Sequence, residues 1–350
     1  MKTINVAASR QYNIHIGPGL LEQCGVLIQQ IHRPCTAVIV TDDVVAPLYA
    51  RQAEASLQAA GFTPRRFAFP HGERSKSAAT LLQLYSFLAE AGVTRSDLIV
   101  ALGGGVVGDL AGFAAATYLR GVRFVQLPTT LLAAVDSSVG GKTGIDLEAG
   151  KNLVGAFWQP SLVVCDTDAL NTLPPDIFAD GAAEVVKYGV MTDLSLFELL
   201  ENGQLHKYLE EIICRCVEIK RDVVQRDEHE TGERQLLNLG HTLGHGVEKL
   251  SEYTISHGHA VAIGMVAIAR AAAAFGLCGP DCPQRLADTL TRYDLPVACP
   301  FGAEELMQAA LADKKRQGEV ITLIVPRALG RSELYPLPVS RLKSFIEKGL

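Results

Sequence analysis

Several features that would assign this sequence to a protein class are missing from it. The formal net charge is −6, so there is no excess of positive charge to form a nucleic-acid surface. No stretch reaches transmembrane length without charged residues, and the N-terminus lacks the apolar segment of a signal peptide. We therefore expect a protein with neither a nucleic-acid nor a membrane partner.

Cysteine spacing excludes two further classes. The eight cysteines include no paired CxxC zinc spacing and do not form the framework of a small disulfide-rich domain. A reduced, cytoplasmic setting is the simplest interpretation. The 350 residues, 48% of them hydrophobic and 20% charged, allow two globular domains with a large core.

The first half of the chain alternates between strand and helix patterns. Residues 1–17 alternate apolar and polar side chains and predict an edge ribbon, and apolar runs at 36–41, 66–69, 97–102, 123–127 and 162–165 predict strands of a mainly parallel sheet. After Pro174-Pro175 helical periods dominate, at about 176–190, 193–202, 205–227, 233–249 and 257–275, followed by shorter helices. The sequence predicts an α/β domain over 1–173 and a mainly α-helical domain over 174–350.

A run of glycines separates one predicted strand from the next helix. Gly103, Gly105 and Gly108 fit the spacing G-x-G-x-x-G, which lets the backbone approach a pyrophosphate at a helix N-terminus. The acidic residue expected about 20 positions later is absent. The match predicts nucleotide or phosphate binding without an ordinary Rossmann fingerprint, and a tight turn made only for packing is the alternative.

Two other polar stretches lie in the first half. Asp42 ends a predicted buried strand, where a carboxylate can bond ribose hydroxyls or cap the next helix, and both interpretations stay open. Gly140-Gly141-Lys142-Thr143 ends like a P-loop, but Asp136 occupies the position of its first glycine. Lys142, Lys151 and Asn152 among glycines favour an anion-binding cradle.

The densest group of polar residues lies in the second half. Five of the nine histidines fall between positions 229 and 259, and His241 and His245 are one helical turn apart. Their spacing predicts a metal or catalytic site, or else a pair of buried histidines bonded to backbone carbonyls. Glu184 and Lys187 share a helix face among apolar residues, which is unusual for a pair of that spacing because most are solvated.

Together these motifs resemble those of one family. The motifs are Gly103-Gly-Gly-Val-Val-Gly-Asp109, Asp136-Ser-Ser-Val-Gly-Gly-Lys-Thr143, Gly150-Lys-Asn152, Ala183-Glu-Val-Val-Lys-Tyr-Gly189, Leu236-Leu-Asn-Leu-Gly-His-Thr-Leu-Gly-His245 and His257-Gly258. In this order they strongly resemble the 3-dehydroquinate synthases, a family of sugar-phosphate cyclases. The resemblance covers nearly the whole chain and implies an NAD-binding Rossmann-like domain, a helical metal- and substrate-binding domain and a site in the cleft between them.

The resemblance also implies a reaction and its cofactors. Members of the family bind NAD and one divalent ion, usually Zn²⁺ or Co²⁺. They convert 3-deoxy-D-arabino-heptulosonate 7-phosphate, an anionic seven-carbon sugar phosphate, to 3-dehydroquinate and phosphate in the shikimate route to aromatic amino acids. Homodimers are a family expectation.

Residue roles follow from the same resemblance. The implied metal ligands are Glu184, His241 and His257, which assigns His245 to acid–base chemistry and corrects the interpretation of His241 and His245 as a ligand pair. The implied NAD contacts are Asp42, His71, Gly72, Glu73, Arg74, Ser75, Lys76, Gly105, Val106, Val107, Gly108, Asp109, Thr129, Thr130, Lys142, Lys151, Ala169, Leu170, Asn171 and Thr172. The implied catalytic and substrate-binding residues are His245, Glu230, Arg120, Asp136, Lys142, Asn152, Lys187, Lys220, Arg234, Asn238 and one of Lys314 or Lys315.

One position departs from the family pattern. The family commonly has His-Gly-Glu where this chain has His257-Gly258-His259, so His259 could compete as a ligand or bond outside the ligand set, and we favour the second. Lys220, Arg234, Asn238 and the Asp313-Lys314-Lys315 turn match the dehydroquinate pattern better than that of cyclases that make valiolone or deoxy-inosose products. The main alternative function is an NAD-dependent polyol dehydrogenase, which would release NADH stoichiometrically; a non-enzymatic binding module is the third hypothesis.

Overall fold

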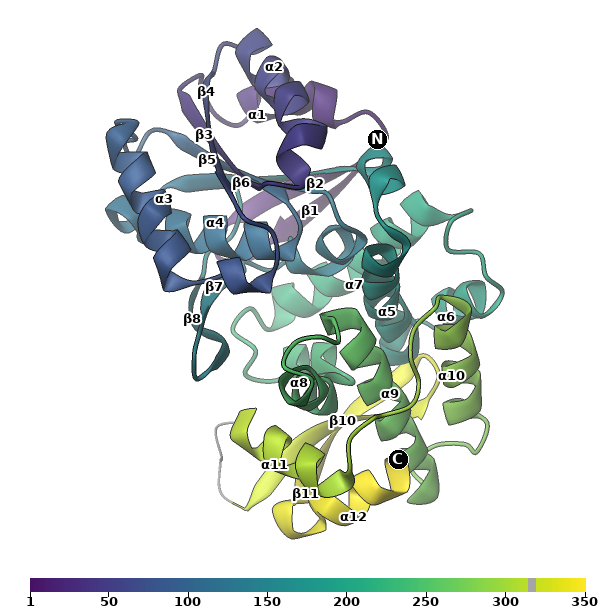
Figure 1. Cartoon of the computed structure of the whole chain (residues 1–350). Helices are drawn as coiled ribbons and strands as arrows, with labels where there is room; N and C mark the ends of the chain where they lie inside the picture. The colour runs from purple at the N-terminus through teal and green to yellow at the C-terminus, as the bar shows by residue number, and fades with distance from the viewer. Residues whose placement is uncertain (314–318) are drawn as a thin grey trace. The chain divides into compact units, whose positions relative to one another are not determined.

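The computed structural model describes residues 1–313 and 319–350, which form two compact units (Figure 1). Unit 1 consists of Met1–Leu173 and Lys220–His229, and unit 2 consists of Pro174–Ile219 and Glu230–Leu350. The predicted division into two contiguous domains with one boundary at Leu173 is therefore corrected, because residues 220–229 belong to unit 1. The side chains of Gln225 and Glu228 accept hydrogen bonds from the backbone N–H groups of Ala7 and Ser9, at 2.9 and 2.8 Å. Residues 205–227 were predicted as one helix, and its hydrophobic periodicity does not show that its two ends belong to different units.

A seven-stranded sheet forms the centre of unit 1, with the order β1-β2-β9-β6-β5-β3-β4. Every neighbouring pair is parallel except the edge pair β1–β2. The strands are β1 (Lys2–Ala7), β2 (Gln11–Gly17), β3 (Thr36–Asp42), β4 (Thr63–Phe69), β5 (Leu98–Gly103), β6 (Arg123–Pro128) and β9 (Leu162–Asp166). The edge ribbon and the mainly parallel sheet are confirmed.

Helices cover both faces of this sheet (Figure 1). Side chains alternate between faces along each strand: Ile39 and Val100 join the core with α1 and α2, while Val38 and Ile99 join the core with α3 and α4. Burial on both faces explains why these strands read as unbroken apolar runs. The helices are α1 (Cys24–Gln29), α2 (Arg51–Ala59), α3 (Ala78–Glu90) and α4 (Gly105–Thr117), with short turns η1 (Leu21–Gln23), η2 (Ala46–Ala50), η3 (Glu73–Ser75), η4 (Tyr118–Arg120), η5 (Ala133–Ser137) and η6 (Thr167–Thr172).

The strand order reverses between β3 and β5. From β3 the chain adds β4 on one side, and β5, β6 and β9 then extend the sheet on the other side. In open parallel sheets, ligands bind outside the carboxyl ends of the strands at such a switch point. The fold therefore places the Asp42 end of β3 beside the Gly103 end of β5, where a nucleotide site is expected.

Unit 1 also holds a separate two-stranded ribbon that was not predicted. Strands β7 (Lys142–Leu147) and β8 (Gly150–Phe157) pair in antiparallel fashion and pack against α4. The stretch interpreted as a glycine-rich anion cradle is therefore a hairpin, with Lys151 and Asn152 just after its turn. The local sequence contains too few alternating apolar residues to have shown this pairing.

Unit 2 is mainly helical. Its elements are α5 (Pro175–Thr192), α6 (Leu194–Glu201), α7 (Leu209–Arg226), η7 (Glu233–Asn238), α8 (His241–Leu250), α9 (His257–Ala274), α10 (Cys282–Arg292), α11 (Ala303–Asp313), β10 (Val320–Ala328), β11 (Arg331–Pro338) and α12 (Val339–Gly349). The continuous helix predicted over 233–249 is wrong, since it breaks into η7 and α8 at Gly240, whose φ is +81°. That left-handed conformation favours glycine and ends helical geometry.

The helix α9 is the core element of unit 2. It packs against α5, α8, α10, α12 and β10. Its length and mean hydropathy of 1.2 would suit a membrane span, yet 72% of this window is buried inside the structure. These apolar residues therefore serve as the core of a globular unit.

The hairpin of β10 and β11 was missed because only further helices were predicted after residue 275. Its two strands pair in antiparallel register across Gly330, and Pro326 and Pro336 lie inside them. Prolines weaken a strand pattern, although they are tolerated in a two-stranded ribbon that has free edges.

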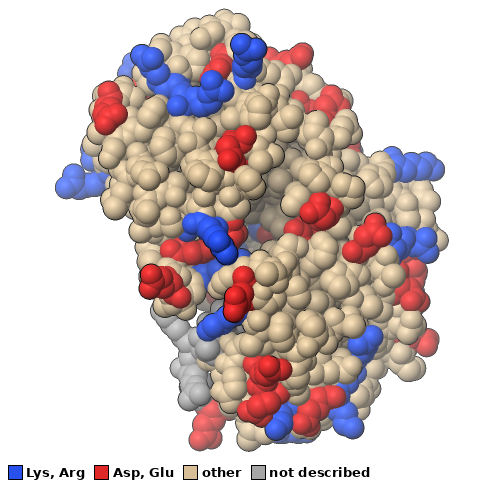
Figure 2. All heavy atoms as spheres, in the orientation of Figure 1, with Lys and Arg blue, Asp and Glu red and all other residues tan. Residues whose placement is uncertain are grey.

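On the face drawn in Figure 2, acidic and basic side chains are intermingled without a large basic field.

Candidate functional site

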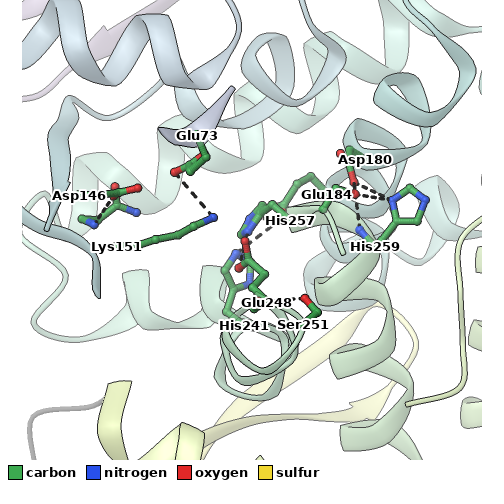
Figure 3. Close-up of polar contacts among 12 residues, drawn as sticks. Glu73, Asp146, Lys151, Asp180, Glu184, His241, Glu248, Ser251, His257 and His259 are labelled. Carbon is green, nitrogen blue, oxygen red and sulfur yellow. Dashed lines mark hydrogen bonds and ion pairs between the residues drawn. The ribbon is translucent and has the colours of Figure 1, made fainter. Parts of the chain in front are cut away.

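Three helices of unit 2 bring one carboxylate and two imidazoles together. Glu184 lies on α5, while His241 and His257 are the first residues of α8 and α9. The donor atoms of the three residues all lie within 4.8 Å of one another. The Nε2 atoms of His241 and His257 are 3.6 and 3.7 Å from the same Glu184 oxygen, Oε1. Figure 3 shows the three side chains converging.

Two glycines allow the helices to approach closely enough. A Cβ on Gly240 would lie 2.6 Å from the Met265 side chain, and one on Gly258 would lie 2.3 to 2.6 Å from backbone atoms of Asp180. Both glycines are next to a histidine of this cluster, Gly240 before His241 and Gly258 after His257. Their missing side chains therefore position the first turns of α8 and α9 against their neighbours.

The hydrogen bond at the second ring nitrogen orients each imidazole. Nδ1 of His241 lies 3.1 Å from the backbone oxygen of Leu239, and Nδ1 of His257 lies 3.2 Å from Oε2 of Glu248. Because these oxygens are acceptors, both Nδ1 atoms donate. Each ring therefore directs Nε2 toward Glu184, as ligating histidines commonly do.

Burial decides the electrostatics of this cluster. The side chains of Glu184 and Lys187 are each 1% exposed and form an ion pair on α5, so the suspicion that this pair is not a solvated contact is confirmed. Burial lowers the pKa of His241 to about 3, aided by Lys187 and the other imidazoles and opposed by Glu184. Burial also lowers the pKa of His257, but hydrogen bonds to Glu184 and Glu248 outweigh it and raise that pKa to about 10.

The donor set fits a divalent transition metal. A carboxylate with two imidazoles matches the ligands of catalytic zinc sites, which leave positions open for substrate. The side chains of His241 and His257 are 13% and 33% exposed, so the cluster is accessible on the histidine side. The residues of this chain therefore fit the metal that the sequence resemblance implied.

His259 is directed elsewhere. Its Nδ1 lies 2.8 Å from both Asp180 Oδ1 and Ser256 Oγ, and its backbone N–H also donates to Asp180. Among the described residues His259 belongs to neither three-donor group. This geometry supports its placement outside the ligand set.

Other predicted residues of unit 2 gather on η7 and α8. The ring of His245 is centred 5.5 Å from that of His241 and 6.1 Å from that of His257. Asn238 donates a 2.8 Å hydrogen bond to Glu230, whose φ is +60°. Arg234 is 1% exposed, an unusual location for a guanidinium without a functional or structural task.

The predicted NAD contacts of unit 1 follow the ends of its parallel strands. Asp42 ends β3, the His71–Lys76 loop follows β4, Gly105 to Asp109 follow β5, Thr129 and Thr130 follow β6, and Ala169 to Thr172 follow β9. The carboxyl ends of parallel strands meet at one edge, so the topology gathers these residues there. Thr129 Oγ1 is buried without a hydrogen-bond partner within the described part of the chain. This edge therefore fits a dinucleotide.

Lys76 is the centre of a charged cluster at this edge. Its Nζ, on a side chain 5% exposed, lies 2.7 Å from Asn152, 2.9 Å from Glu73 and 3.3 Å from Asp109. Burial raises the pKa of Asp109 to about 6, although Lys76 opposes the shift. Burial lowers the pKa of Lys76, but the nearby carboxylates outweigh it and raise that pKa. Figure 3 shows Lys151 with Glu73, 3.7 Å apart.

The carboxylate of Asp42 bonds the backbone of the turn that precedes η2, whose N-cap residue is Val45. Its Oδ1 accepts hydrogen bonds from the N–H groups of Val44 and Val45, at 3.0 and 2.7 Å. His71 pairs with Asp43, and hydrogen bonding by His71 lowers the pKa of that carboxyl. A ribose contact by Asp42 stays a prediction.

The predicted substrate residues of unit 1 are only partly brought together. Lys220 donates to the backbone oxygen of Asp136 at 2.7 Å and pairs with its carboxylate at 3.1 Å. Asn152 bonds Lys76 instead, while Lys142 begins β7 and Arg120 lies exposed in η4 with φ +65°. Lys314 and Lys315 lie outside the described residues.

Sequence reasoning missed several residues of these clusters. Asp146, which lies 3.7 Å from Lys76, and Asp180 and Glu248 in unit 2 were given no role. Glu248 had a detectable signal, because it follows His241 by seven residues and His245 by three and so shares their helix face. A carboxylate on the apolar side of a helix usually has a specific partner.

Comparison with known proteins defines the class first. The structure matches 2-deoxy-scyllo-inosose synthase, crystallised with carbaglucose-6-phosphate, NAD⁺ and Co²⁺, at a TM-score of 0.89 and 27% identity over all of both chains. It matches 2-epi-5-epi-valiolone synthase of Streptomyces hygroscopicus subsp. jinggangensis, crystallised with NAD⁺ and Zn²⁺, at 0.89 and 25% identity over 99% of this chain and 98% of that one. The fold is thus that of the sugar-phosphate cyclases, and the two structures it matches contain NAD⁺ with Co²⁺ or Zn²⁺.

The sequence comparisons are more specific. Residues 66–180 match the 3-dehydroquinate synthase N-terminal model and residues 181–316 the C-terminal model. The 3-dehydroquinate synthase of Pelobacter propionicus is 47% identical over 97% of each chain. The chain belongs to the 3-dehydroquinate synthase family.

Proposed function

We propose that the chain is a carbon–oxygen lyase that converts 3-deoxy-D-arabino-heptulosonate 7-phosphate to 3-dehydroquinate and phosphate, using NAD and one divalent ion. The observation that carries this proposal is the donor set of Glu184, His241 and His257, in a chain 47% identical to a 3-dehydroquinate synthase. The matches to family members with that name cover 97 to 99% of this chain and of each relative, so the assignment concerns both units of the chain.

Each cofactor has a set of residues in one unit. The strand ends of unit 1, with the α4 N-terminus and the Lys76 cluster, would hold NAD, which accepts a hydride from a substrate carbinol and later returns it. Glu184, His241 and His257 of unit 2 would hold Zn²⁺ or Co²⁺, which polarises the alcohol that is oxidised. Crystallised sugar-phosphate cyclases with NAD⁺ and Co²⁺ or Zn²⁺ support the use of both cofactors.

Buried cations provide the affinity for an anionic substrate. Lys187 and Arg234 are each 1% exposed, and such charges are stable in a protein interior only when anions or dipoles surround them. Lys187 already pairs with Glu184, and we assign the phosphate and the carboxylate of the substrate to these cations as further anionic partners. The family resemblance adds Lys220, Lys142 and Arg120 as proposed contacts of the same anionic groups and Asp136 as a partner for a hydroxyl. Asn152 and Asn238 add neutral hydrogen bonds.

Proton transfers fall to the remaining polar groups. The C–H beside the new carbonyl becomes acidic, and loss of its proton expels phosphate. The imidazole of His245, beside both ligand imidazoles, is the group we assign to proton transfer during ring opening and aldol closure. The Glu230 carboxylate, oriented by Asn238, is the second such group.

The alternatives are less well supported. A polyol dehydrogenase needs no anion site, whereas this chain buries Lys187 and Arg234 in the same unit as the metal donor set. Cyclases that make inosose or valiolone products are 27% and 25% identical to this chain, well below the 47% of the dehydroquinate synthase. A cytoplasmic homodimer remains part of the proposal.

The test follows phosphate release and the absorbance of reduced nicotinamide in parallel. Metal-loaded protein with catalytic NAD and the heptulosonate phosphate should release phosphate over many turnovers without net NADH, and product analysis should find 3-dehydroquinate. If no phosphate is released, and NADH accumulates when a polyol is supplied as the substrate, the chain is a dehydrogenase instead.

Two variants make this assay specific. His245→Gln should reduce the release of phosphate by about 100-fold, because it removes a group that transfers protons. Glu201→Gln removes a partly exposed carboxylate that pairs with Arg285 at 2.7 Å and should leave the rate unchanged.

A further inference from the structure

Glu248 is a buried carboxylate to which the reaction above assigns no task. It lies on α8 with a side chain 2% exposed. Burying an ionised carboxylate is costly unless a donor or a cation is directed at it. Its contacts therefore show what it does.

The contact of Glu248 is with a proposed metal ligand. Its Oε2 lies 3.2 Å from Nδ1 of His257, and Figure 3 shows the two side chains facing each other. A carboxylate oxygen accepts, so Nδ1 carries the hydrogen. The other ring nitrogen, Nε2, is 3.7 Å from Glu184 and is the atom available to a metal.

The turn between α8 and α9 fixes this contact. The backbone oxygen of Glu248 accepts hydrogen bonds from the Tyr253 N–H at 2.8 Å and from the Ser251 hydroxyl at 2.9 Å. Glu252 and Tyr253 adopt φ values of +52° and +62°, which non-glycine residues rarely do. This tight turn returns the chain so that the first residue of α9 faces the last turns of α8.

A second interpretation is that Glu248 is itself a ligand. His245, Glu248 and His257 form another group whose donor atoms lie within 4.8 Å of one another. The two groups share His257, and the Nδ1 atom that faces Glu248 cannot both donate a hydrogen bond and bind an ion. The matching arrangement of His241, with Nδ1 on Leu239 and Nε2 toward Glu184, favours the hydrogen bond.

We propose that Glu248 is a positioning residue, which holds His257 in the tautomer and ring orientation that present Nε2 to the divalent ion. The inference rests on the proposed metal ligands. Carboxylates placed behind a metal-bound imidazole typically change metal affinity by about 10- to 100-fold when they are removed.

Three substitutions of Glu248 separate its possible roles. Glu248→Ala removes the side chain, Glu248→Met fills the space without an acceptor, and Glu248→Gln keeps a neutral acceptor oxygen. Zn²⁺ affinity is measured by competition with a chromophoric chelator, and the visible absorption of Co²⁺-loaded protein reports the ligand geometry. Glu201→Gln is the matched control, because it removes another carboxylate of unit 2 that contacts no ligand.

We expect one ion per chain in wild-type protein and affinities weakened about 10- to 100-fold in the Ala and Met variants. The Gln variant should lie between these and wild type, and the Co²⁺ spectrum should change only in the Glu248 series. Unchanged affinity with only a lower melting temperature would overturn the inference and leave a structural role. Two ions in wild type, with one lost in all three variants, would overturn it in favour of a ligand role. Failure of wild type to bind any ion would overturn the proposed metal site itself.

Discussion

The candidate sites of the two units are built in different ways. In unit 1, residues from five strand ends gather at one edge because the strands are parallel, so the sheet topology positions them. In unit 2, three helices must place three donor atoms within 4.8 Å of one another, which depends on individual side chains and close helix contacts. A site positioned by sheet topology should therefore tolerate changes in individual side chains. A site assembled from helix ends should depend on the position of each donor atom.

The substitution with the largest expected effect is His257→Ala, which tests whether the two candidate sites are separate. It should weaken Zn²⁺ binding at least about 1000-fold, because a three-donor site loses one donor. NAD affinity should stay at the wild-type value, since the proposed contacts lie in unit 1. Both are measured by titration calorimetry, with His206→Ala as control because this exposed histidine of unit 2 stacks on Phe178 outside the donor set. Equal losses of both affinities would contradict the separation of the sites.

Gly258→Ala tests the close approach of helices. Its Cβ would meet Asp180 backbone atoms at 2.3 Å, so α5 and α9 must separate and the free energy of unfolding should fall by about 3 kcal/mol. Glu184 would then move relative to His257, and Zn²⁺ affinity should fall at least about 10-fold. Denaturant titration and chelator competition measure the two effects. Gly279→Ala, whose Cβ meets no atom within 4 Å, should change neither, and a tolerated Gly258 variant would show that the contact is adaptable.

Lys76→Met acts on unit 1 alone. It leaves Glu73, Asp109 and Asp146 without their shared cation, so stability should fall by about 2 to 3 kcal/mol. NAD affinity should fall about 10-fold, as expected for one lost charged contact. Zn²⁺ affinity should not change, and the same two titrations decide this. If the variant binds NAD with the wild-type affinity, Lys76 does not belong to the proposed cofactor site.

The smallest expected effect is a dependence on pH. The pKa of Asp109 is raised to about 6 by burial, so it lies above the unfolded value and its contribution to stability is lost as pH rises through 6. Between pH 4 and pH 7, wild type should therefore lose about 1 to 2 kcal/mol relative to Asp109→Asn. Denaturant titrations of both proteins across this range measure the difference. Parallel stability curves would mean that Asp109 does not titrate there.

Sequence patterns predicted much of unit 1. Burial on both sheet faces makes β3 and β5 continuous apolar runs, and Gly103 to Gly105 mark the turn to α4. The hairpins β7–β8 and β10–β11 were missed, because strand pairing depends on partners that local periodicity does not name. The helix placing His241 and His245 on one face was predicted, whereas its break at Gly240 was not.

The sequence by itself determined the family and the parallel sheet, and its resemblance to the family predicted the three donor residues, because these depend on local patterns and motif order. Only the tertiary structure decided which atoms face one another: Nε2 of both histidines toward Glu184, Glu248 behind His257, Asp180 with His259, and residues 220–229 with unit 1. The physical reason is that burial of a charge and the direction of a ring nitrogen depend on side chains distant in the chain, whose proximity no sequence spacing encodes.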